Sequence, residues 1–383
     1  MRLDTFQMER LQSTWENRVK FNLSESSVHP MSTRELVSSP DFHDQLLDIP
    51  LAYNQSNGTD DLRTQIASLY PGATLDNVEV TNGGSEANFL SIYSMLEPGD
   101  EVIMILPSYQ QIWGLINSFG MIVKPVWLRE DLNWAPDCEA LKAALSPRTK
   151  MIAVCNPNNP TGAILTPAEM ETIVSLASHS GAWILADEIY QGSERDGKIT
   201  PTFYGLYDRI IITNGLSKAY GLPGLRIGWI VAPKDLIAKT WSCHDYTSIA
   251  PGTLSDLLAR VALSPGGRAR CYERTRTICR GNYPILKKWV ESHGSMFCMA
   301  EPRAGAIAFL RYQLPINSTS LMERILKEKS VLIVPGDHFG MDNYIRVGYG
   351  PPPDYLQQAL EHINDILESY LHAISGGANL RTD

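Results

Sequence analysis

Short, almost wholly apolar segments alternate with helix-forming segments through the middle of this 383-residue chain. Glu101–Leu106 and Met151–Cys155 are segments of this kind, and Trp183–Ala186 and Ile210–Thr213 repeat the pattern. A strand that is apolar along its length is buried on both faces, as in a parallel sheet with helices on either side. The chain is therefore predicted to have an α/β fold whose large domain holds a mainly parallel sheet sandwiched by helices.

Turn and helix-start signals support this alternation. Val78–Val80 is predicted to be a strand, followed by a glycine turn and a helix over about 85–96. Thr166 is expected to cap a further helix, because Pro167 suits the first helical position and Glu169 completes a capping box. In a parallel sheet, chemistry collects where the strands end, so the residues that follow each strand are the candidates for a site.

The sequence pattern changes near residue 275, where a helix around Tyr283–Ser292 precedes several short strands. This pattern is typical of a smaller α+β domain. At the other end, residues 1–20 resemble an amphipathic helix that docks on the body of the protein or on a partner subunit. We therefore expect an N-terminal helix and substrate-side segment that packs with the small domain (1–45), a large domain that carries the main sheet (46–275) and a small C-terminal domain (276–383).

Composition argues against several classes of function. A net charge of −9 and a pI near 5.4 make nucleic acid an unsuitable main partner. No apolar run is long enough to predict a membrane span, and the charged N-terminal segment is unlike a signal peptide. The six cysteines lack CxxC spacing and the eight histidines lack HxxxH or HxH spacing, so neither a disulfide framework nor a metal site is expected. The expected location is the cytoplasm.

The segment Ser217–Trp229 carries the strongest functional signal. Lys218 follows a short apolar strand, and Arg226 stands eight residues further on between glycines. This arrangement suits a lysine that forms a Schiff base with an aldehyde cofactor, and an arginine that binds the phosphate of the same cofactor. Ser217, which precedes the lysine, belongs to the same set of candidate cofactor-binding residues.

A second motif, Thr81–Ala87, joins a predicted strand to a predicted helix. Gly84 allows the backbone to approach a ligand closely, and the helix N-terminus offers free N–H groups to a phosphate. Ser85 can add a hydroxyl donor. Taken alone, this segment favours an ordinary tight turn with a helix N-cap over a phosphate site.

Two further motifs follow predicted strands. Asn159 lies in the stiff, proline-containing loop Asn156–Gly162 and can donate an amide hydrogen bond to a phenolate-like oxygen. Asp187 ends a strand, where a desolvated carboxylate is costly unless it faces a cation such as a protonated pyridine nitrogen. Tyr190, three residues on, can reach the hydroxyl group of that ring. Each motif alone is also consistent with a structural turn or a capped helix.

Tyr109 and Arg346 have weaker signals. Tyr109 follows Glu101–Leu106 and could lie flat on a cofactor ring, although packing is the more common role of such a tyrosine. Arg346 leaves a short strand near the C-terminus and can bind a carboxylate through two hydrogen bonds or form a surface salt bridge. Both assignments depend on the other motifs.

Together, Asn156–Gly162, Asp187–Tyr190, Ser217–Trp229 and Ile345–Gly350 resemble the class I/II aminotransferases. These fold type I enzymes of the aspartate aminotransferase superfamily depend on pyridoxal 5′-phosphate (PLP). The resemblance runs from about residue 53 to residue 350 and keeps the order and spacing of the motifs. It implies a PLP-binding large domain, amino acid and 2-oxo acid substrates, and a homodimer whose active sites are each completed by the other chain.

The resemblance also implies a role for each candidate residue. Lys218 would hold the cofactor as an aldimine, and Asp187 would pair with the pyridine nitrogen. The remaining implied contacts are Tyr109, Asn159 and Tyr190 with the ring, Gly84, Ser85 and Arg226 with the phosphate, Ser217 with the cofactor, Tyr53 with the phosphate of the neighbouring subunit, and Arg346 with the substrate carboxylate. Asn159 and Glu25 complete the set of candidate substrate-binding residues.

Three departures from the family pattern concern the cofactor and the substrate. Gly215 stands where relatives usually have a serine or threonine that contacts the phosphate. Asn22–Ser26 replaces a glycine-rich substrate loop, and Glu25 within it either meets a cationic substrate side chain or is solvated or salt-bridged. Asp337 and His338 follow Gly336, where relatives often have serine.

The expected reaction moves the α-amino group of an L-amino acid to a 2-oxo acid, with an uncharged Lys218 amine in a desolvated pocket as the base at Cα. A PLP-dependent racemase, a cyclase or γ-eliminating lyase, or an oxidase on the same fold is the alternative. A non-catalytic regulatory protein is a remote alternative, because no helix-turn-helix precedes residue 50 and the charge is acidic. A dinucleotide-dependent dehydrogenase lacks support, since no GxGxxG follows the early strands.

Overall fold

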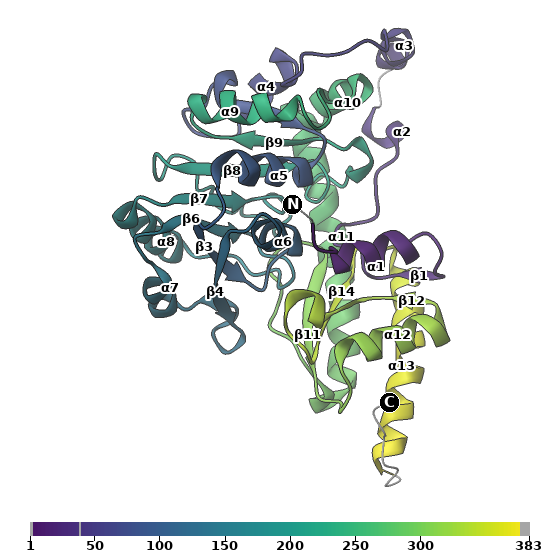
Figure 1. The fold of residues 1–383 in the computed structure, drawn as a ribbon. Helices are drawn as coiled ribbons and strands as arrows, with labels where there is room; N and C mark the ends of the chain where they lie inside the picture. The colour runs from purple at the N-terminus through teal and green to yellow at the C-terminus, as the bar shows by residue number, and fades with distance from the viewer. Residues whose placement is uncertain (1–2, 38–39, 376–383) are drawn as a thin grey trace.

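The large sheet has eight strands and forms the centre of the fold in this computed structural model, which describes residues 3–37 and 40–375 (Figure 1). The strand order is β2-β9-β8-β7-β6-β3-β4-β5, and the pairs from β8 to β4 are parallel. The strands are β2 (Val78–Thr81), β3 (Glu101–Leu106), β4 (Ile122–Arg129), β5 (Ala135–Pro136), β6 (Thr149–Cys155), β7 (Trp183–Asp187), β8 (Ile210–Gly215) and β9 (Gly228–Val231).

Helices cover both faces of this sheet because successive side chains of a strand point to opposite sides. Val102 and Met104 of β3 pack with one helix layer, whereas Ile103 and Ile105 pack with the other. The first layer holds α5 (Gly84–Met95), α6 (Gln110–Ser118) and α9 (Lys234–His244). The second layer holds α4 (Asp60–Ala67), α7 (Cys138–Ala144), α8 (Pro167–Ser180) and α10 (Thr253–Leu263).

The predicted start of α8 is confirmed. The Thr166 hydroxyl accepts a hydrogen bond from the Glu169 N–H at 3.3 Å, and the Glu169 carboxylate accepts one from the Thr166 N–H at 2.6 Å. Pro167 occupies the first helical position. This reciprocal capping satisfies two backbone donors that the helix cannot pair, so the loop Asn156–Gly162 ahead of it joins a fixed helix end.

A smaller antiparallel sheet, with the order β10-β11-β14-β13, lies toward the C-terminus and has its own apolar core. The N-terminal segment joins this part, because Phe21 of β1 pairs with Val331 of β12. Figure 1 accordingly shows α1 close to the C-terminal elements. The remaining elements are α1 (Gln7–Trp15), β1 (Phe21–Asn22), α2 (Thr33–Leu36), α3 (Pro40–Asp48), α11 (Pro265–Ser292), β10 (Phe297–Cys298), β11 (Ile307–Tyr312), α12 (Ser318–Lys329), β12 (Val331–Leu332), β13 (Val334–Pro335), β14 (Tyr344–Gly348) and α13 (Pro353–Ser375).

The helix predicted around Tyr283–Ser292 is the second half of the longer helix α11. Tyr272 in its first half belongs to the core of the large sheet, and Cys279 and Tyr283 belong to the core of the small sheet. One continuous helix therefore links the two cores, and the change in sequence pattern near residue 275 marks a change of packing partner within that helix. No helix in the described ranges is long and apolar enough to cross a membrane.

Candidate active site

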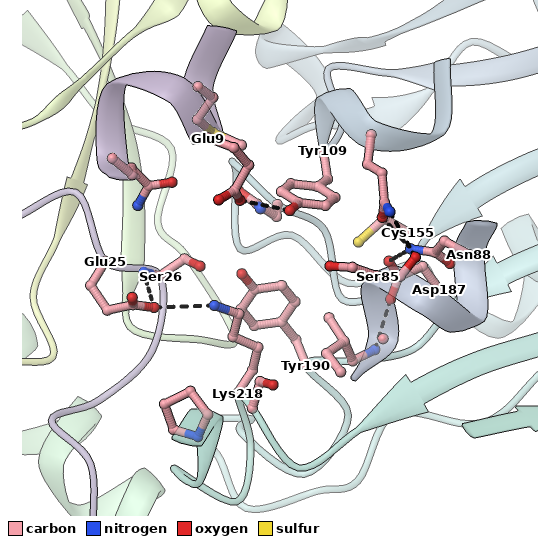
Figure 2. Close-up of a pocket in the computed structure, with 18 of the residues that line it drawn as sticks. Glu9, Glu25, Ser26, Ser85, Asn88, Tyr109, Cys155, Asp187, Tyr190 and Lys218 are labelled. Carbon is pink, nitrogen blue, oxygen red and sulfur yellow. Dashed lines mark hydrogen bonds and ion pairs between the residues drawn. The ribbon is translucent and has the colours of Figure 1, made fainter. Parts of the chain in front are cut away.

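A cavity of about 450 Å³ lies where the parallel strands of the large sheet end (Figure 2). The structure brings together in its lining every site residue predicted from the sequence except Tyr53, whose side chain is 86% exposed on the surface. The predicted residues in the lining are Glu25, Gly84, Ser85, Tyr109, Asn159, Asp187, Tyr190, Ser217, Lys218, Arg226 and Arg346.

Lys218 follows β8 and points into the cavity, where its Nζ lies 3.1 Å from Oε1 of Glu25 (Figure 2). Burial lowers the pKa of Lys218, but the negative charge of Glu25 and its hydrogen bond to the ammonium outweigh burial and raise the pKa above its usual value. The Lys218 ammonium in turn lowers the pKa of Glu25. The cofactor-free site therefore holds Lys218 as an ammonium paired with Glu25, a contact that sequence reasoning did not predict. Linkage to a carbonyl requires the neutral amine, so the ion pair must open.

Asp187, at the end of β7, is buried and accepts hydrogen bonds from the Ile189 N–H at 3.1 Å and from Nδ2 of Asn88 at 3.2 Å. Asn88 is fixed in turn by the hydroxyl of Thr213, which donates to its Oδ1 at 2.6 Å. Burial raises the pKa of Asp187, and no basic side chain in the described part of the chain forms an ion pair with it. The carboxylate is thus oriented but not neutralised, which fits a cationic ring nitrogen.

Sequence reasoning missed Asn88. It lies one turn beyond Gly84 on the buried side of α5, where the other polar residues, Ser91 and Ser94, donate to carbonyl groups of their own helix. A polar residue at such a position is the signal that points to a buried partner.

Tyr190 and Asn159 offer polar groups to a ligand. The Tyr190 hydroxyl is buried and has no hydrogen-bond partner among the described residues, an arrangement that costs free energy unless a ligand supplies the partner. Oδ1 of Asn159 accepts a hydrogen bond from Nη1 of Arg346 at 2.9 Å, which leaves the amide N–H groups as donors. Nη2 of Arg346 donates to the Ser24 carbonyl at 2.5 Å, whereas its buried Nε is unpaired within the described ranges.

The turn before α5 forms a cradle that needs glycine. Gly83 has a φ of +89°, and a Cβ there would lie 2.3 Å from Nη2 of Arg226. The Arg226 guanidinium therefore packs directly against the helix N-terminus, within 3.5 Å of the Ser217 hydroxyl. Free N–H groups, a hydroxyl and a guanidinium at one helix end fit a phosphate.

The departure at Gly215 has a steric cause. A Cβ at this position would lie 2.7 Å from the carbonyl oxygen of Ile227 and 3.0 Å from Cα of Gly228. The close approach of the chain at Ile227 and Gly228 leaves no room here for the serine or threonine that the family pattern led us to expect. The Ser217 hydroxyl is the nearby group that can take over a phosphate contact.

Tyr109 lines the cavity and donates its hydroxyl hydrogen to Oε1 of Glu9 at 2.7 Å (Figure 2). Phe6 packs edge-on against its ring at a centroid distance of 5.2 Å. The ring is thus held by the segment that leads into α1. Asp337 and His338, by contrast, do not line the cavity in the described structure; the Asp337 carboxylate accepts a hydrogen bond from the Thr319 hydroxyl at 2.7 Å near the start of α12.

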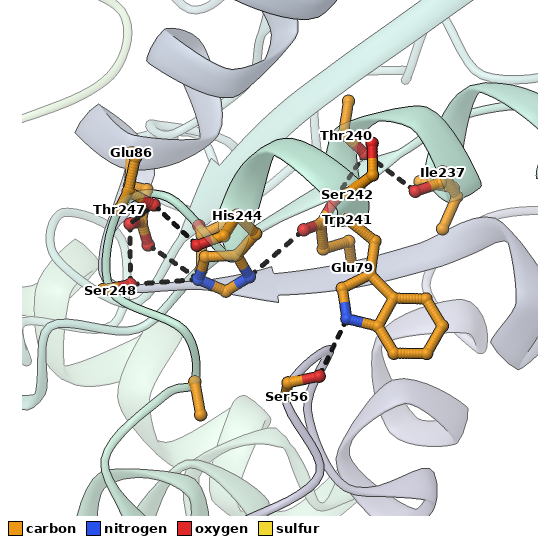
Figure 3. A network of polar contacts seen from close by, with 12 residues as sticks. Ser56, Glu79, Glu86, Ile237, Thr240, Trp241, Ser242, His244, Thr247 and Ser248 are labelled. Carbon is orange, nitrogen blue, oxygen red and sulfur yellow. Dashed lines mark hydrogen bonds and ion pairs between the residues drawn. The ribbon is translucent and has the colours of Figure 1, made fainter.

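A network of polar contacts around His244 holds the glycine turn that precedes α5 (Figure 3). His244 lies between two carboxylates, with Nδ1 3.2 Å from Glu79 and Nε2 3.3 Å from Glu86. Glu86 also accepts a hydrogen bond from the Asn82 N–H at 2.6 Å, next to the turn. Burial lowers the pKa of His244, but the two glutamates outweigh burial and raise it to about 9. The sequence gives no spacing signal for this network.

Replacing His244 with glutamine is expected to lower the free energy of unfolding by about 3 kcal/mol, because it leaves a buried carboxylate without its partner. The pKa of His244 is about 9 in the folded protein, above its ordinary value of 6.5. Its contribution is therefore complete below about pH 6.5 and is lost as the pH rises through about 9. Urea unfolding of the cofactor-free protein across this range measures the difference.

The exposed His179 on α8 supplies the control for this measurement. His179→Gln should change the free energy of unfolding by less than about 0.5 kcal/mol. A destabilisation by His244→Gln that stays constant up to pH 10 would show that shape, and not charge, explains the role of His244.

Comparison with known proteins bears on this site. The family model for aminotransferase class I and II matches residues 51–363. Capreomycidine synthase of Streptomyces vinaceus is 33% identical to this protein, over 92% of this chain and 91% of the length of the synthase. An aspartate aminotransferase of Streptomyces avermitilis is 28% identical over 87% of this chain and 84% of its own. The solved structure of a PLP-dependent aminotransferase from Streptococcus suis has a TM-score of 0.90 and 33% identity, covering 97% of this chain and 99% of that chain.

These similarities confirm the predicted family resemblance and the predicted fold class. The family match extends over both the eight-stranded and the four-stranded sheet and over the lining residues from Gly84 to Arg346. No group of three or more histidine, cysteine, aspartate or glutamate side chains that could hold a metal ion occurs in the described ranges.

Proposed function

Since this chain belongs to the aminotransferase class I and II family and is a PLP-dependent enzyme, we propose that it transfers the α-amino group of an L-amino acid to a 2-oxo acid at the cavity around Lys218. One observation carries this proposal. Three groups converge on a single cavity from the ends of two neighbouring strands. Asp187, a carboxylate without a basic partner, and the unpaired buried hydroxyl of Tyr190 come from the end of β7, and Lys218 follows β8.

The residues present fit PLP, which supplies an aldehyde for linkage to an amine and a ring that accepts electrons from Cα. In this proposal Asp187 holds a proton on the ring nitrogen, Tyr190 and Asn159 bind the ring oxygen, and Tyr109 covers the ring. Gly84, Ser85, Ser217 and Arg226 bind the phosphate.

Two residues act on the substrate in this proposal. Arg346 binds the α-carboxylate, because its unpaired Nε and its Nη groups lie in the cavity wall. Asn159, already bonded to Arg346, fixes that guanidinium in place. Lys218, freed from the cofactor, would take the proton from Cα and deliver it to the carbon that carried the cofactor's aldehyde, so that water can release the substrate as a 2-oxo acid.

We also propose a homodimer in which Tyr53 reaches the cofactor phosphate of the other subunit. Tyr53 is 86% exposed, and Leu47 and Leu51 in the same segment are each 82% exposed. Exposed apolar residues that gather in one segment are typical of an interface. The three-part division 1–45, 46–275 and 276–383, a biosynthetic role and a cytoplasmic location remain part of the proposal.

The proposed reaction can be tested with purified protein loaded with PLP. Amino acids are supplied with and without 2-oxoglutarate or pyruvate, and the new amino acid formed from the acceptor is measured by chromatography. We expect a new amino acid only when both substrates are present, in amounts that match the donor consumed. Donor consumption that continues without any acceptor would contradict amino-group transfer.

A second candidate function is another PLP-dependent reaction on a single amino acid. This reaction is a cyclisation or γ-elimination, a racemisation or an oxidation. The relative at 33% identity favours it, because that protein is named as a synthase and not as an aminotransferase. The same experiment separates the two candidates, since the second needs no 2-oxo acid acceptor. Product chirality identifies a racemase in the same samples.

A further inference from the structure

Helix α1 turns a polar face toward the cavity. Glu9, Gln12 and Glu16 follow one another at intervals of three and four residues, so their side chains lie on one side of the helix, and all three line the cavity. Glu25, from the segment after β1, adds another carboxylate (Figure 2). The wall opposite the glycine turn is therefore acidic.

Once cofactor and substrate are bound, the basic residues of the lining no longer neutralise the charge of these carboxylates. Arg226 faces the cofactor phosphate and Arg346 faces the substrate carboxylate in the proposed function. Lys218, the present partner of Glu25, is engaged by the cofactor. Glu9 and Glu16 form no ion pair with any described residue, and the contact of Glu9 is with the neutral hydroxyl of Tyr109.

The carboxylates also act on one another. Burial raises the pKa of Glu16, and the charges of Glu25 and Glu9 raise it further. Like charges held in a partly closed cavity are unfavourable unless a cation enters between them. That a ligand enters this cavity is indicated independently by the unpaired Tyr190 hydroxyl and the unpaired Nε of Arg346, both in side chains that are almost fully buried.

Gln12 supplies a neutral acceptor on the same wall. Its Nε2 donates to the carbonyl oxygen of Ser24 at 2.9 Å and to the Ser24 hydroxyl at 3.2 Å. These two bonds fix the amide, so its Oε1 is left to accept a hydrogen bond. The same Ser24 carbonyl accepts a hydrogen bond from Arg346. The acidic wall and the proposed carboxylate site are thus joined through one residue.

We infer that the substrate is an amino acid with a cationic side chain, an ammonium or guanidinium group, which lies against Glu16 and Glu25 while Arg346 binds its α-carboxylate. This inference rests on the proposed function, because it takes Lys218 to be engaged by the cofactor. It identifies α1 and Asn22–Ser26 as the segments that select the side chain. Glu9, which also holds Tyr109, contributes negative charge to the same wall.

Binding can be measured without catalysis. Isothermal titration calorimetry of the PLP-loaded protein compares 5-guanidinopentanoate with hexanoate; both offer a carboxylate to Arg346, and neither has an α-amine. We expect the guanidino acid to bind at least about ten-fold more tightly, and Glu16→Gln and Glu25→Gln each to remove about ten-fold to a hundred-fold of its affinity, as for hydrogen bonds to charged groups. Arg10→Gln, an exposed change on α1, is the control and should leave its affinity within about two-fold.

Catalysis gives the second readout. Arginine, lysine and ornithine are compared with norleucine and glutamate as donors, with kcat and KM measured separately. We expect the cationic donors to have the highest kcat/KM and the glutamine variants to raise KM for these donors most. Three results would each overturn the inference. The first is equal affinity for the two probe acids, and the second is a preference for neutral or acidic donors. The third is an equal fall in kcat for all donors in Glu25→Gln, which would show that Glu25 acts on the pKa of Lys218 and not on the substrate.

The two proposals fail in different ways. If the guanidino acid binds tightly and the glutamine variants weaken it, but no acceptor receives an amino group, the assignment of the side-chain class stands and amino-group transfer is wrong. If neutral donors transfer their amino group as well as arginine does, transfer stands and the assignment of a cationic substrate is wrong.

Discussion

Lys218→Ala is expected to reduce amino-group transfer by at least about ten-thousand-fold, because no other lysine lines the cavity in the described structure to link the cofactor or to move the proton at Cα. The measurement is the rate of product formation with PLP and both substrates in excess. Borohydride reduction of the loaded wild-type protein, followed by peptide mapping, should label Lys218 and give no label at this position in the variant.

Lys218→Arg is the matched variant for this prediction. Arginine keeps a positive charge beside Glu25, so the ion pair and the local packing can persist. It cannot supply a neutral amine, since its guanidinium stays charged. We expect both variants to fold, with thermal transitions close to that of the cofactor-free wild type, and both to be inactive. Wild-type activity in either variant would refute the assignment of Lys218.

Asp187→Asn is expected to lower kcat/KM by about a thousand-fold, because a neutral amide cannot hold a proton on a ring nitrogen as a carboxylate can. The substitution keeps the size of the side chain, and Asn88 and the Ile189 N–H remain in place to contact it. The cofactor should also bind more weakly to the variant, which equilibrium dialysis of PLP measures.

The adjacent Glu188 provides a stringent control for Asp187. It is also buried, but burial raises its pKa to about 8, and its carboxyl group accepts hydrogen bonds from the Phe203 N–H at 2.8 Å and from the Thr202 hydroxyl. Glu188 directly follows the last residue of β7, and its carboxyl group does not line the cavity described above. Glu188→Gln should therefore keep kcat/KM within about five-fold, since an amide replaces a mostly protonated carboxyl group. Equal losses in the two variants would show that the effect is structural.

Several contacts of the site could be predicted because they follow from local rules. A strand that is apolar throughout has to be buried on both faces, and the chain after it emerges at the edge of the sheet. Asp187 ends such a strand, and Lys218 and Asn159 follow neighbouring strands within four residues, so their convergence follows from the sheet. Gly84 and Ser85 are placed in the same way, at the helix start that follows β2.

The N-terminal segment shows where this reasoning stops. An amphipathic helix was expected there, and α1 is such a helix, but it covers only Gln7–Trp15. Its pattern indicated a face for docking without indicating the partner. Only the assembled chain shows that Glu9 reaches Tyr109 and that Glu16 faces the cavity.

The sequence by itself determined the fold class, the family and many of the residues that line the cavity, because apolar periodicity and motif spacing are properties of neighbouring residues. The tertiary structure alone decided that Glu25 meets Lys218, that Asn88 orients Asp187, and that His244 joins Glu79 to Glu86. Each of these contacts joins elements far apart in the chain, and its energy depends on burial and on the approach of charges, which exist only once the elements have packed.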